Sequence, residues 1–226
     1  MKSNKKTGRL LGLLFLLIFA TGITVYQFLQ SPVLFSDDFL TNTSANSNEI
    51  IISTLLLFLS GITSVFIASV LLPIFKKHSS TLAFLYLASS ILGFIAISID
   101  NISVLSMLEL SLEYTKNETG NSDILNTLGS VFYKKHWWSH YLSLLISCFP
   151  VFILYYTLYV SKLIPKVISI VGIIAVILMF IEILFSVFGN SISMNMLLPI
   201  GLIQLILPIW LILKGLNSSV LETEMN

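Results

Sequence analysis

Charged side chains are scarce in this sequence, and their scarcity decides the class of protein. Lys, Arg, Asp and Glu together make up 10% of the 226 residues, whereas a soluble domain carries about 25%. Hydrophobic residues make up 56% of the chain. A chain of this composition cannot cover a folded surface with polar groups, so it requires an apolar solvent, and the soluble globular, disordered and coiled-coil classes are excluded.

Cysteine and an excess of positive charge are also lacking. The single cysteine, Cys148, excludes an internal disulfide framework and any zinc or iron–sulfur site built from cysteines. The formal net charge of +1 leaves no basic excess for binding nucleic acid. The sequence contains no Walker loop, dinucleotide fingerprint, G-x-S-x-G elbow or H-E-x-x-H motif, so it lacks these signatures of catalysis.

Long apolar runs are what the sequence has instead. A transmembrane helix needs about 20 mostly apolar residues, and six segments meet this requirement. We therefore predict an all-α polytopic membrane protein, a bundle of six transmembrane helices that forms a single integral-membrane domain over residues 1–226. The predicted spans cover residues 9–29, 50–75, 81–105, 137–160, 167–188 and 194–213.

The segments between the spans are of different kinds. Ser31 to Glu49 is rich in Ser, Asn and Thr and predicts a polar loop. Residues 109–135 carry apolar side chains at helical spacing, which predicts a short helical extracellular segment between spans three and four. The apolar run from Leu10 to Tyr26 is longer than a signal-peptide core of about 7–15 residues and ends without a small-residue cleavage site, so we expect the first helix to remain uncleaved.

The distribution of basic residues predicts the orientation. Cytoplasmic loops of membrane proteins carry an excess of Lys and Arg, and a cytoplasmic N-terminus places nine of the twelve basic residues inside. Six spans also return the C-terminus to the cytoplasm. We predict a multi-pass protein of the plasma membrane, and a composition rich in Ile, Leu, Asn, Ser and Lys favours a bacterial origin. The nine residues are Lys2, Lys5, Lys6, Arg9, Lys76, Lys77, Lys162, Lys166 and Lys214.

Four ionisable residues are expected at one depth, near the outer boundary of the membrane. At about 1.5 Å per residue, Asp100 lies roughly 30 Å above the inner end of span three, and Glu182 lies roughly 26 Å up span five. His136 and His140 begin span four from the outside, and their i, i+4 spacing places both imidazoles on one helix face. Counting on three helices thus predicts a polar cluster of Asp100, His136, His140 and Glu182.

The sequence leaves open what such a cluster would do. Two imidazoles and two carboxylates are a donor set suited to zinc or another divalent transition metal. The same residues can form a polar network or ligand pocket without a metal. They can also be separate interfacial anchors, because amphipathic side chains settle at the depth of the lipid headgroups.

Three functions follow from these alternatives. The first is non-catalytic binding of a lipid, an apolar ligand, a membrane protein partner or a second copy of the chain. The second is a small transporter. The third is a membrane-embedded metal-dependent hydrolase with an outward-facing site, so the sequence leaves open whether the protein is an enzyme. In each case membrane lipids are the expected surroundings.

Three segments also carry a family resemblance. They are Lys5 to Gly12 before span one, Tyr159 to Lys166 between spans four and five, and Trp210 to Gly215 at the end of span six. Together they resemble a bacterial family of six-span membrane proteins catalogued as a domain of unknown function (four-three-eight-six). The resemblance implies one integral-membrane domain that covers nearly the whole chain, and it implies no established activity.

Overall fold

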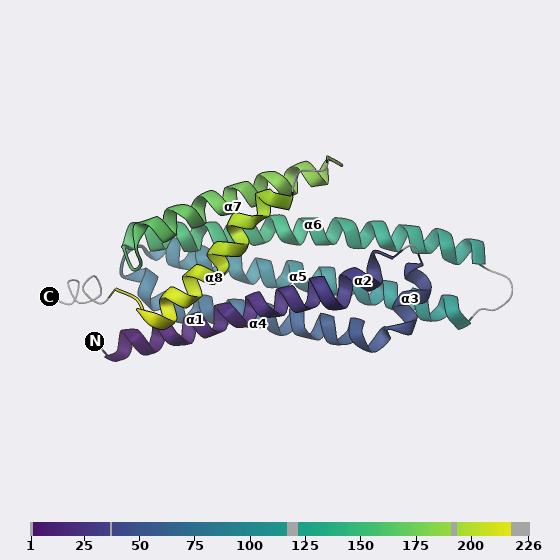
Figure 1. The fold of residues 1–226 in the computed structure, drawn as a ribbon, viewed down its shortest axis with the longest axis horizontal. Helices are drawn as coiled ribbons and strands as arrows, with labels where there is room; N and C mark the ends of the chain where they lie inside the picture. Colours follow the sequence, from purple (N-terminus) through teal and green to yellow (C-terminus); the bar gives the residue numbers. More distant parts are fainter. Residues whose placement is uncertain (1, 37, 117–121, 191–193, 218–226) are drawn as a thin grey trace.

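A computed structural model describes the chain except for residues 1, 37, 117–121, 191–193 and 218–226. The described residues form a bundle of long helices in which the start of the first helix and the end of the last lie at the same end of the molecule (Figure 1). We call this the terminal end and the opposite one the distal end. The elements are α1 (Lys2–Ile23), η1 (Thr24–Gln30), α2 (Ser31–Leu34), α3 (Phe39–Ala45), α4 (Ser47–Lys76), α5 (Ser80–Lys116), α6 (Ser122–Ser161), α7 (Lys166–Val187), η2 (Met194–Leu197) and α8 (Leu198–Leu213).

Five helical segments are long and apolar enough to cross a membrane: residues 5–34, 47–76, 80–116, 123–161 and 166–187. The first four contain the first four predicted spans, and the fifth covers the predicted span 167–188 except for its last residue. The sixth predicted span, residues 194–213, is divided between the 3₁₀ helix η2 and α8, which has 16 residues. At about 1.5 Å per residue α8 is roughly 24 Å long, so by itself it is shorter than the hydrocarbon core of about 30 Å.

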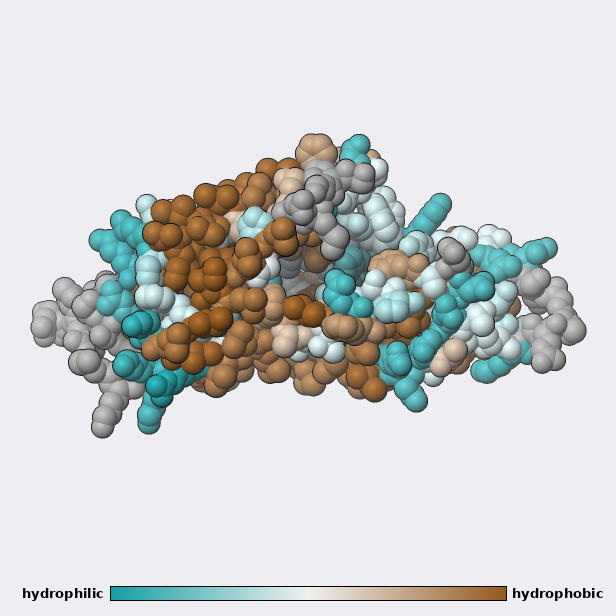
Figure 2. Space-filling model, viewed as in Figure 1, coloured by the Kyte–Doolittle hydropathy of each residue, from teal (hydrophilic) through white to brown (hydrophobic). Residues whose placement is uncertain are grey.

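The apolar surface forms a band around the bundle. Figure 2 shows hydrophobic residues over the terminal half of the molecule, with hydrophilic residues at the terminal end and over much of the distal half. Exposed hydrophobic side chains occur on every long helix, among them Leu17, Phe66, Leu92, Phe152 and Ile174. Because lipid tails are as apolar as leucine, such residues can face outward in a membrane.

Helices α5 and α6 are much longer than a bilayer is thick. They contain 37 and 40 residues, or about 56 and 60 Å at about 1.5 Å per residue. The predicted helical segment at residues 109–135 is therefore formed by continuations of both helices, up to Lys116 and from Ser122, and the turn expected between them lies outside the described residues.

The expected polar loop from Ser31 to Glu49 is mostly helical, so that prediction was wrong. The apolar residues of this segment explain its helical structure, since Val33 and Leu34 pack with Ile50 of α4 and Met107 of α5 in a buried apolar cluster at the distal end. The hydroxyl of Ser111 also donates a hydrogen bond to the carbonyl of Leu40, which ties α3 to α5. Because the segment is rich in Ser and Asn, its composition did not indicate that a few apolar residues would pack in this way.

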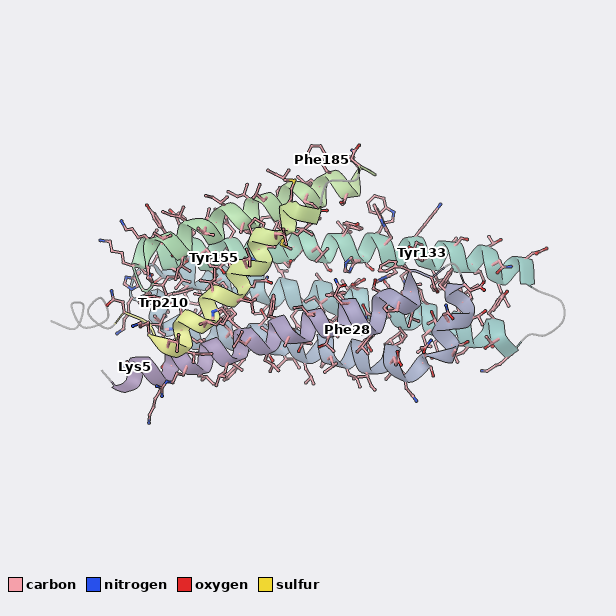
Figure 3. The ribbon with its side chains drawn as sticks, in the orientation of Figure 1. Lys5, Phe28, Tyr133, Tyr155, Phe185 and Trp210 are labelled. Atoms are coloured by element: carbon pink, nitrogen blue, oxygen red, sulfur yellow. The ribbon has the colours of Figure 1, made fainter. Side chains whose placement is uncertain are left out.

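Two glycines bring α1 against α8 at the terminal end. A Cβ atom at Gly12 would lie 2.6 Å from the carbonyl oxygen of Pro208, and one at Gly8 would lie 2.6 Å from the Cα atom of Gly215. Gly8 and Gly12 are four residues apart, and such small-residue pairs let membrane helices approach closely. The first and third segments of the family resemblance therefore meet in space. Lys5 and Trp210, which belong to these segments, both lie toward this end in Figure 3, whereas Tyr133 lies toward the distal end.

Candidate functional site

A buried carboxylate in the middle of α5 is the centre of the candidate site. Asp100 is 3% exposed and lies 20 residues from the start of the helix, or roughly 30 Å along it at about 1.5 Å per residue. This length is about that of the hydrocarbon core. A buried ionised group costs several kcal/mol unless it is paired and hydrogen bonded, so its partners matter.

Both histidines of α6 are those partners. The Nδ1 atom of His136 lies 3.0 Å from Asp100 Oδ1, and the Nδ1 atom of His140 lies 3.2 Å from Asp100 Oδ2. The two side chains are one turn apart on α6, and their ring centroids are 5.8 Å apart. The i, i+4 spacing in the sequence thus places both imidazoles against one carboxylate on the neighbouring helix.

Ser139 supplies a third donor to the same carboxylate. Its hydroxyl lies 2.8 Å from Asp100 Oδ1 and 3.0 Å from the carbonyl oxygen of His136, so its hydrogen is shared between them. Each carboxylate oxygen of Asp100 therefore has at least one donor. The sequence analysis did not include Ser139, although its place between His136 and His140 could have suggested it.

Aromatic rings border the exposed side of this cluster. The centroids of the Tyr26 and His140 rings are 5.4 Å apart in an edge-on arrangement, and those of the Trp137 and Tyr141 rings are 4.6 Å apart. Tyr26 comes from η1, a π-helical segment of seven residues that continues α1. Such segments are rare and often occur at functional sites. A π-helical segment has no simple sequence signature, and the sequence analysis did not find Tyr26.

Further hydrogen bonds of polar side chains join η1 and α5 to α4. Gln30 donates a hydrogen bond to Ser53 at 3.0 Å, and Asn101 donates one to the carbonyl of Thr54 at 3.1 Å. All four residues are buried. The apolar cores at the terminal and distal ends are thus accompanied by hydrogen bonds that link η1 to α4, α4 to α5 and α5 to α6.

Glu182, the fourth predicted member, has a different partner. The hydroxyl of Ser186, one turn further along α7, donates to its Oε1 atom at 3.1 Å. Within the part of the chain that the structure describes, Glu182 makes no hydrogen bond or ion pair with Asp100, His136 or His140. Helix α7 packs on α6 and α8, whereas the imidazoles of α6 are directed at α5. Residue counting along single helices does not give the direction in which α6 presents its histidines.

The hydrogen bonds determine what the imidazoles can offer a ligand. An ionised carboxylate only accepts hydrogen bonds, so with Asp100 ionised each Nδ1 atom that faces it would carry a hydrogen, and a ring with no second hydrogen would keep a lone pair on Nε2. Access is unequal, because the His136 side chain is 4% exposed and that of His140 is 21% exposed. His140 therefore offers the accessible acceptor of the cluster.

The same arrangement bears on metal binding. A metal-ligating histidine commonly donates its other ring N–H to a carboxylate, and here Asp100 would be that carboxylate for two rings. Catalytic zinc sites use three protein ligands. Among the residues that the structure describes, no group of three His, Cys, Asp or Glu side chains is arranged to hold an ion.

Comparison with known proteins gives a family and no relative with an assigned activity. Neither a curated protein nor a solved structure matches the chain. One family model matches residues 10–215, which include the buried cluster and most of the three segments on which the resemblance rests. The resemblance is thereby confirmed, and the chain belongs to the family described as Domain of unknown function (DUF4386).

Proposed function

We propose that this chain is a non-catalytic, multi-pass membrane protein that binds a lipid or similar amphipathic molecule at the outer edge of its apolar band. The ligand would place its polar end against His140 and its apolar part along the helices. The observation that carries the proposal is the shared carboxylate, because the Nδ1 atoms of both rings lie within hydrogen-bond distance of Asp100. An ionised carboxylate would take Nδ1–H from both rings and leave their Nε2 atoms as acceptors.

The proposed topology has six spans, with both termini on the cytoplasmic side of the plasma membrane. The five long apolar segments support it, together with the apolar α8. Lys5 lies in the first turn of α1, Lys76 ends α4, Lys166 begins α7 and Lys214 follows α8. These lysines lie at one end of the bundle, as the positive-inside rule requires for a cytoplasmic face. The predicted helical extensions of α5 and α6 would then be extracellular.

Cysteine labelling tests this topology. In a Cys148→Ser background, Asn48→Cys places a thiol at the distal start of α4, and Ser80→Cys places one at the terminal start of α5; both positions are exposed. We expect an impermeant maleimide added to intact cells to label Asn48→Cys and to label Ser80→Cys only after the cells are opened. The opposite pattern would invert the topology.

The chemistry of the cluster specifies the polar end of the ligand. An unprotonated Nε2 accepts a hydrogen bond, so it favours a ligand group that donates one. The negative charge of Asp100 behind the rings favours a cationic donor. A primary ammonium group meets both requirements, whereas a quaternary ammonium group is cationic but has no N–H to donate.

Phosphatidylethanolamine and phosphatidylcholine are therefore the probes. We expect native mass spectrometry of the full chain to show tighter binding of phosphatidylethanolamine, and we expect His140→Phe to reduce this preference about tenfold. Loss of one charge-assisted hydrogen bond of about 1.5 kcal/mol produces such a change. Phenylalanine keeps an aromatic ring beside Tyr26 but has no nitrogen atoms, so it also loses the hydrogen bond to Asp100.

The matched control is His78→Phe, which makes the same substitution at the terminal end of the bundle, after α4. It should leave the preference unchanged. Equal binding of the two lipids by the unmodified chain would refute the proposed ligand chemistry. An equal loss in both variants would show that His140 has no special role.

A metal-dependent hydrolase is the second candidate, because Asp100 holds two histidines as a carboxylate holds metal-ligating imidazoles. The ligands would be the Nε2 atoms of His136 and His140, and Glu182 would have to turn away from Ser186 to contribute. Elemental analysis of the purified chain separates the candidates. Stoichiometric zinc that disappears in His136→Ala would favour the hydrolase.

A further inference from the structure

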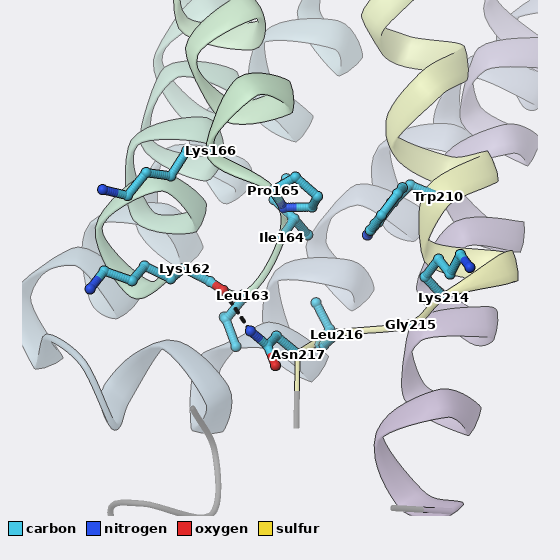
Figure 4. A pocket seen from close by; sticks show the side chains of 10 residues that line it. All are labelled: Lys162, Leu163, Ile164, Pro165, Lys166, Trp210, Lys214, Gly215, Leu216 and Asn217. Atoms are coloured by element: carbon cyan, nitrogen blue, oxygen red, sulfur yellow. Dashed lines mark hydrogen bonds between the residues drawn. The ribbon is translucent and has the colours of Figure 1, made fainter. Parts of the chain in front are cut away.

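A pocket of about 430 Å³ lies at the terminal end, remote from Asp100 along the helices. The pocket lies between the link that joins α6 to α7 and the end of α8 (Figure 4). Ile164 and Pro165 lie on one side, and Trp210 faces them from α8. These are parts of the second and third segments of the family resemblance. Volumes of about 300–1,000 Å³ are typical of small-molecule sites.

The charged residues that line the pocket are all basic. They are Lys162, Lys166 and Lys214, and no acidic side chain among the described residues lines the pocket. In Figure 4 the side chains of Lys162 and Lys166 extend from the link, on the side away from Trp210. All three lysines are exposed, and the Lys166 ammonium lies 5.5 Å from the centroid of the Tyr159 ring. Their flexible side chains form a basic rim beside the pocket and would have to turn toward it to hold a ligand, while Ile164, Pro165 and Trp210 provide an apolar interior.

The backbone adds to this positive character. The pocket includes the start of α7, where no side chain caps the helix at Pro165 and no acidic residue occupies the first turn. Free N–H groups at a helix start attract anions. Lys162 also has a φ of 54°, the only positive φ of a non-glycine residue in the described chain. Glycine adopts a positive φ with less strain, but the chain has the basic residue Lys162 at this position of the rim.

The pocket is held together by contacts between distant segments. The backbone N–H of Asn217 donates to the carbonyl of Leu163 at 2.9 Å, and the side chain of Asn217 lies 3.5 Å from the carbonyl oxygen of Lys162. Gly8 of α1 packs on Gly215 from the other side. The pocket is therefore a fixed part of the fold at the edge of the apolar band.

We propose that this pocket binds the phosphate headgroup of an anionic phospholipid in the leaflet at the terminal end. Tryptophan is enriched at the membrane interface, and basic residues near a cytoplasmic leaflet attract its anionic lipids. The lysine rim would hold the phosphate, while the adjoining glycerol and acyl carbons would lie against Trp210 and Ile164. A free phosphate ester shares the headgroup chemistry but lacks this apolar part.

Fluorescence of Trp210 tests the proposal. With Trp137→Phe and Trp138→Phe, Trp210 is the only tryptophan of the full chain. We expect phosphatidylglycerol with brominated acyl chains to quench its emission at lower mole fractions than brominated phosphatidylcholine does. Changing Lys162, Lys166 and Lys214 to Gln should weaken the apparent affinity for phosphatidylglycerol by about a hundredfold, since each lysine near a membrane surface contributes about fivefold.

The control variant removes the same charge from the same end, with Lys6, Lys76 and Lys77 changed to Gln, because these residues do not line the pocket. It should keep most of the preference for phosphatidylglycerol. The single variant Lys214→Gln, with a weakening of about fivefold, is the second test if the triple variant does not fold. Equal quenching by the two lipids, or equal losses in the two triple variants, would overturn the proposal. Glycerol 3-phosphate should not displace the lipid, and displacement at equal concentration would assign the pocket to a soluble phosphate ester.

Discussion

Replacing Asp100 with alanine should lower the free energy of unfolding by about 3 kcal/mol. The change removes the acceptor of three donors, the Nδ1–H groups of His136 and His140 and the hydroxyl of Ser139. It also leaves these polar groups in a buried site without the charge they surround. Equilibrium unfolding of the full chain in mixed micelles, followed by circular dichroism, measures the effect.

The matched control is Glu182→Ala, since Glu182 is the other carboxylate that lies within a predicted span. Its single hydrogen bond comes from Ser186 on the same helix, so its loss should cost about 1 kcal/mol. Asp100→Asn should fall between the two, because the amide keeps one acceptor oxygen. Equal effects of Asp100→Ala and Glu182→Ala would contradict the assignment of Asp100 as the link between α5 and α6.

Replacing Gly12 with leucine should destabilise the packing of α1 on α8 by about 3 kcal/mol. The new Cβ atom would meet the carbonyl oxygen of Pro208 at 2.6 Å and the backbone nitrogen of Ile212 at 3.2 Å. Backbone atoms cannot rotate away as the end of a side chain can, so the helices must separate. A lower midpoint of thermal unfolding in detergent measures the loss.

Gly22→Leu is the control, because it makes the same substitution in the same helix where a Cβ atom would meet nothing within 4 Å. Its effect should stay within about 0.5 kcal/mol. Similar midpoints for Gly12→Leu and Gly22→Leu would show that α1 does not depend on close contact with α8. The Gly12 variant should also distort the basic pocket, since Gly8 and Gly215 belong to the same contact.

The sequence was sufficient to predict the helical class and the depth of most of the cluster. Apolar runs reveal membrane helices directly, and the rise per residue is nearly constant, so Asp100 and His140 could be placed at one level by counting. The i, i+4 spacing then placed both imidazoles on one face. These are local properties of single helices.

Contacts between helices could not be predicted in the same way. Whether Glu182 faces the cluster depends on the rotation of α7 about its axis and on which helix it packs against, and neither is encoded in hydropathy. The contact of Tyr26 with His140 depends on the π-helical turn of η1. The short helices α2 and α3 pack through a few apolar residues onto α5, and these contacts override a polar composition.

The central claim is that Asp100 orients two imidazoles so that their Nε2 atoms are free to accept from a ligand. Nitrogen-15 NMR of the histidine rings, in the full chain in lipid nanodiscs with His78→Asn, tests it most directly because only His136 and His140 remain. The account predicts protonated Nδ1 and unprotonated Nε2 atoms in both rings, with a shift of the His140 Nε2 signal when phosphatidylethanolamine replaces phosphatidylcholine. Protonated Nε2 atoms with bare Nδ1 atoms, or identical spectra in the two lipids, would contradict it.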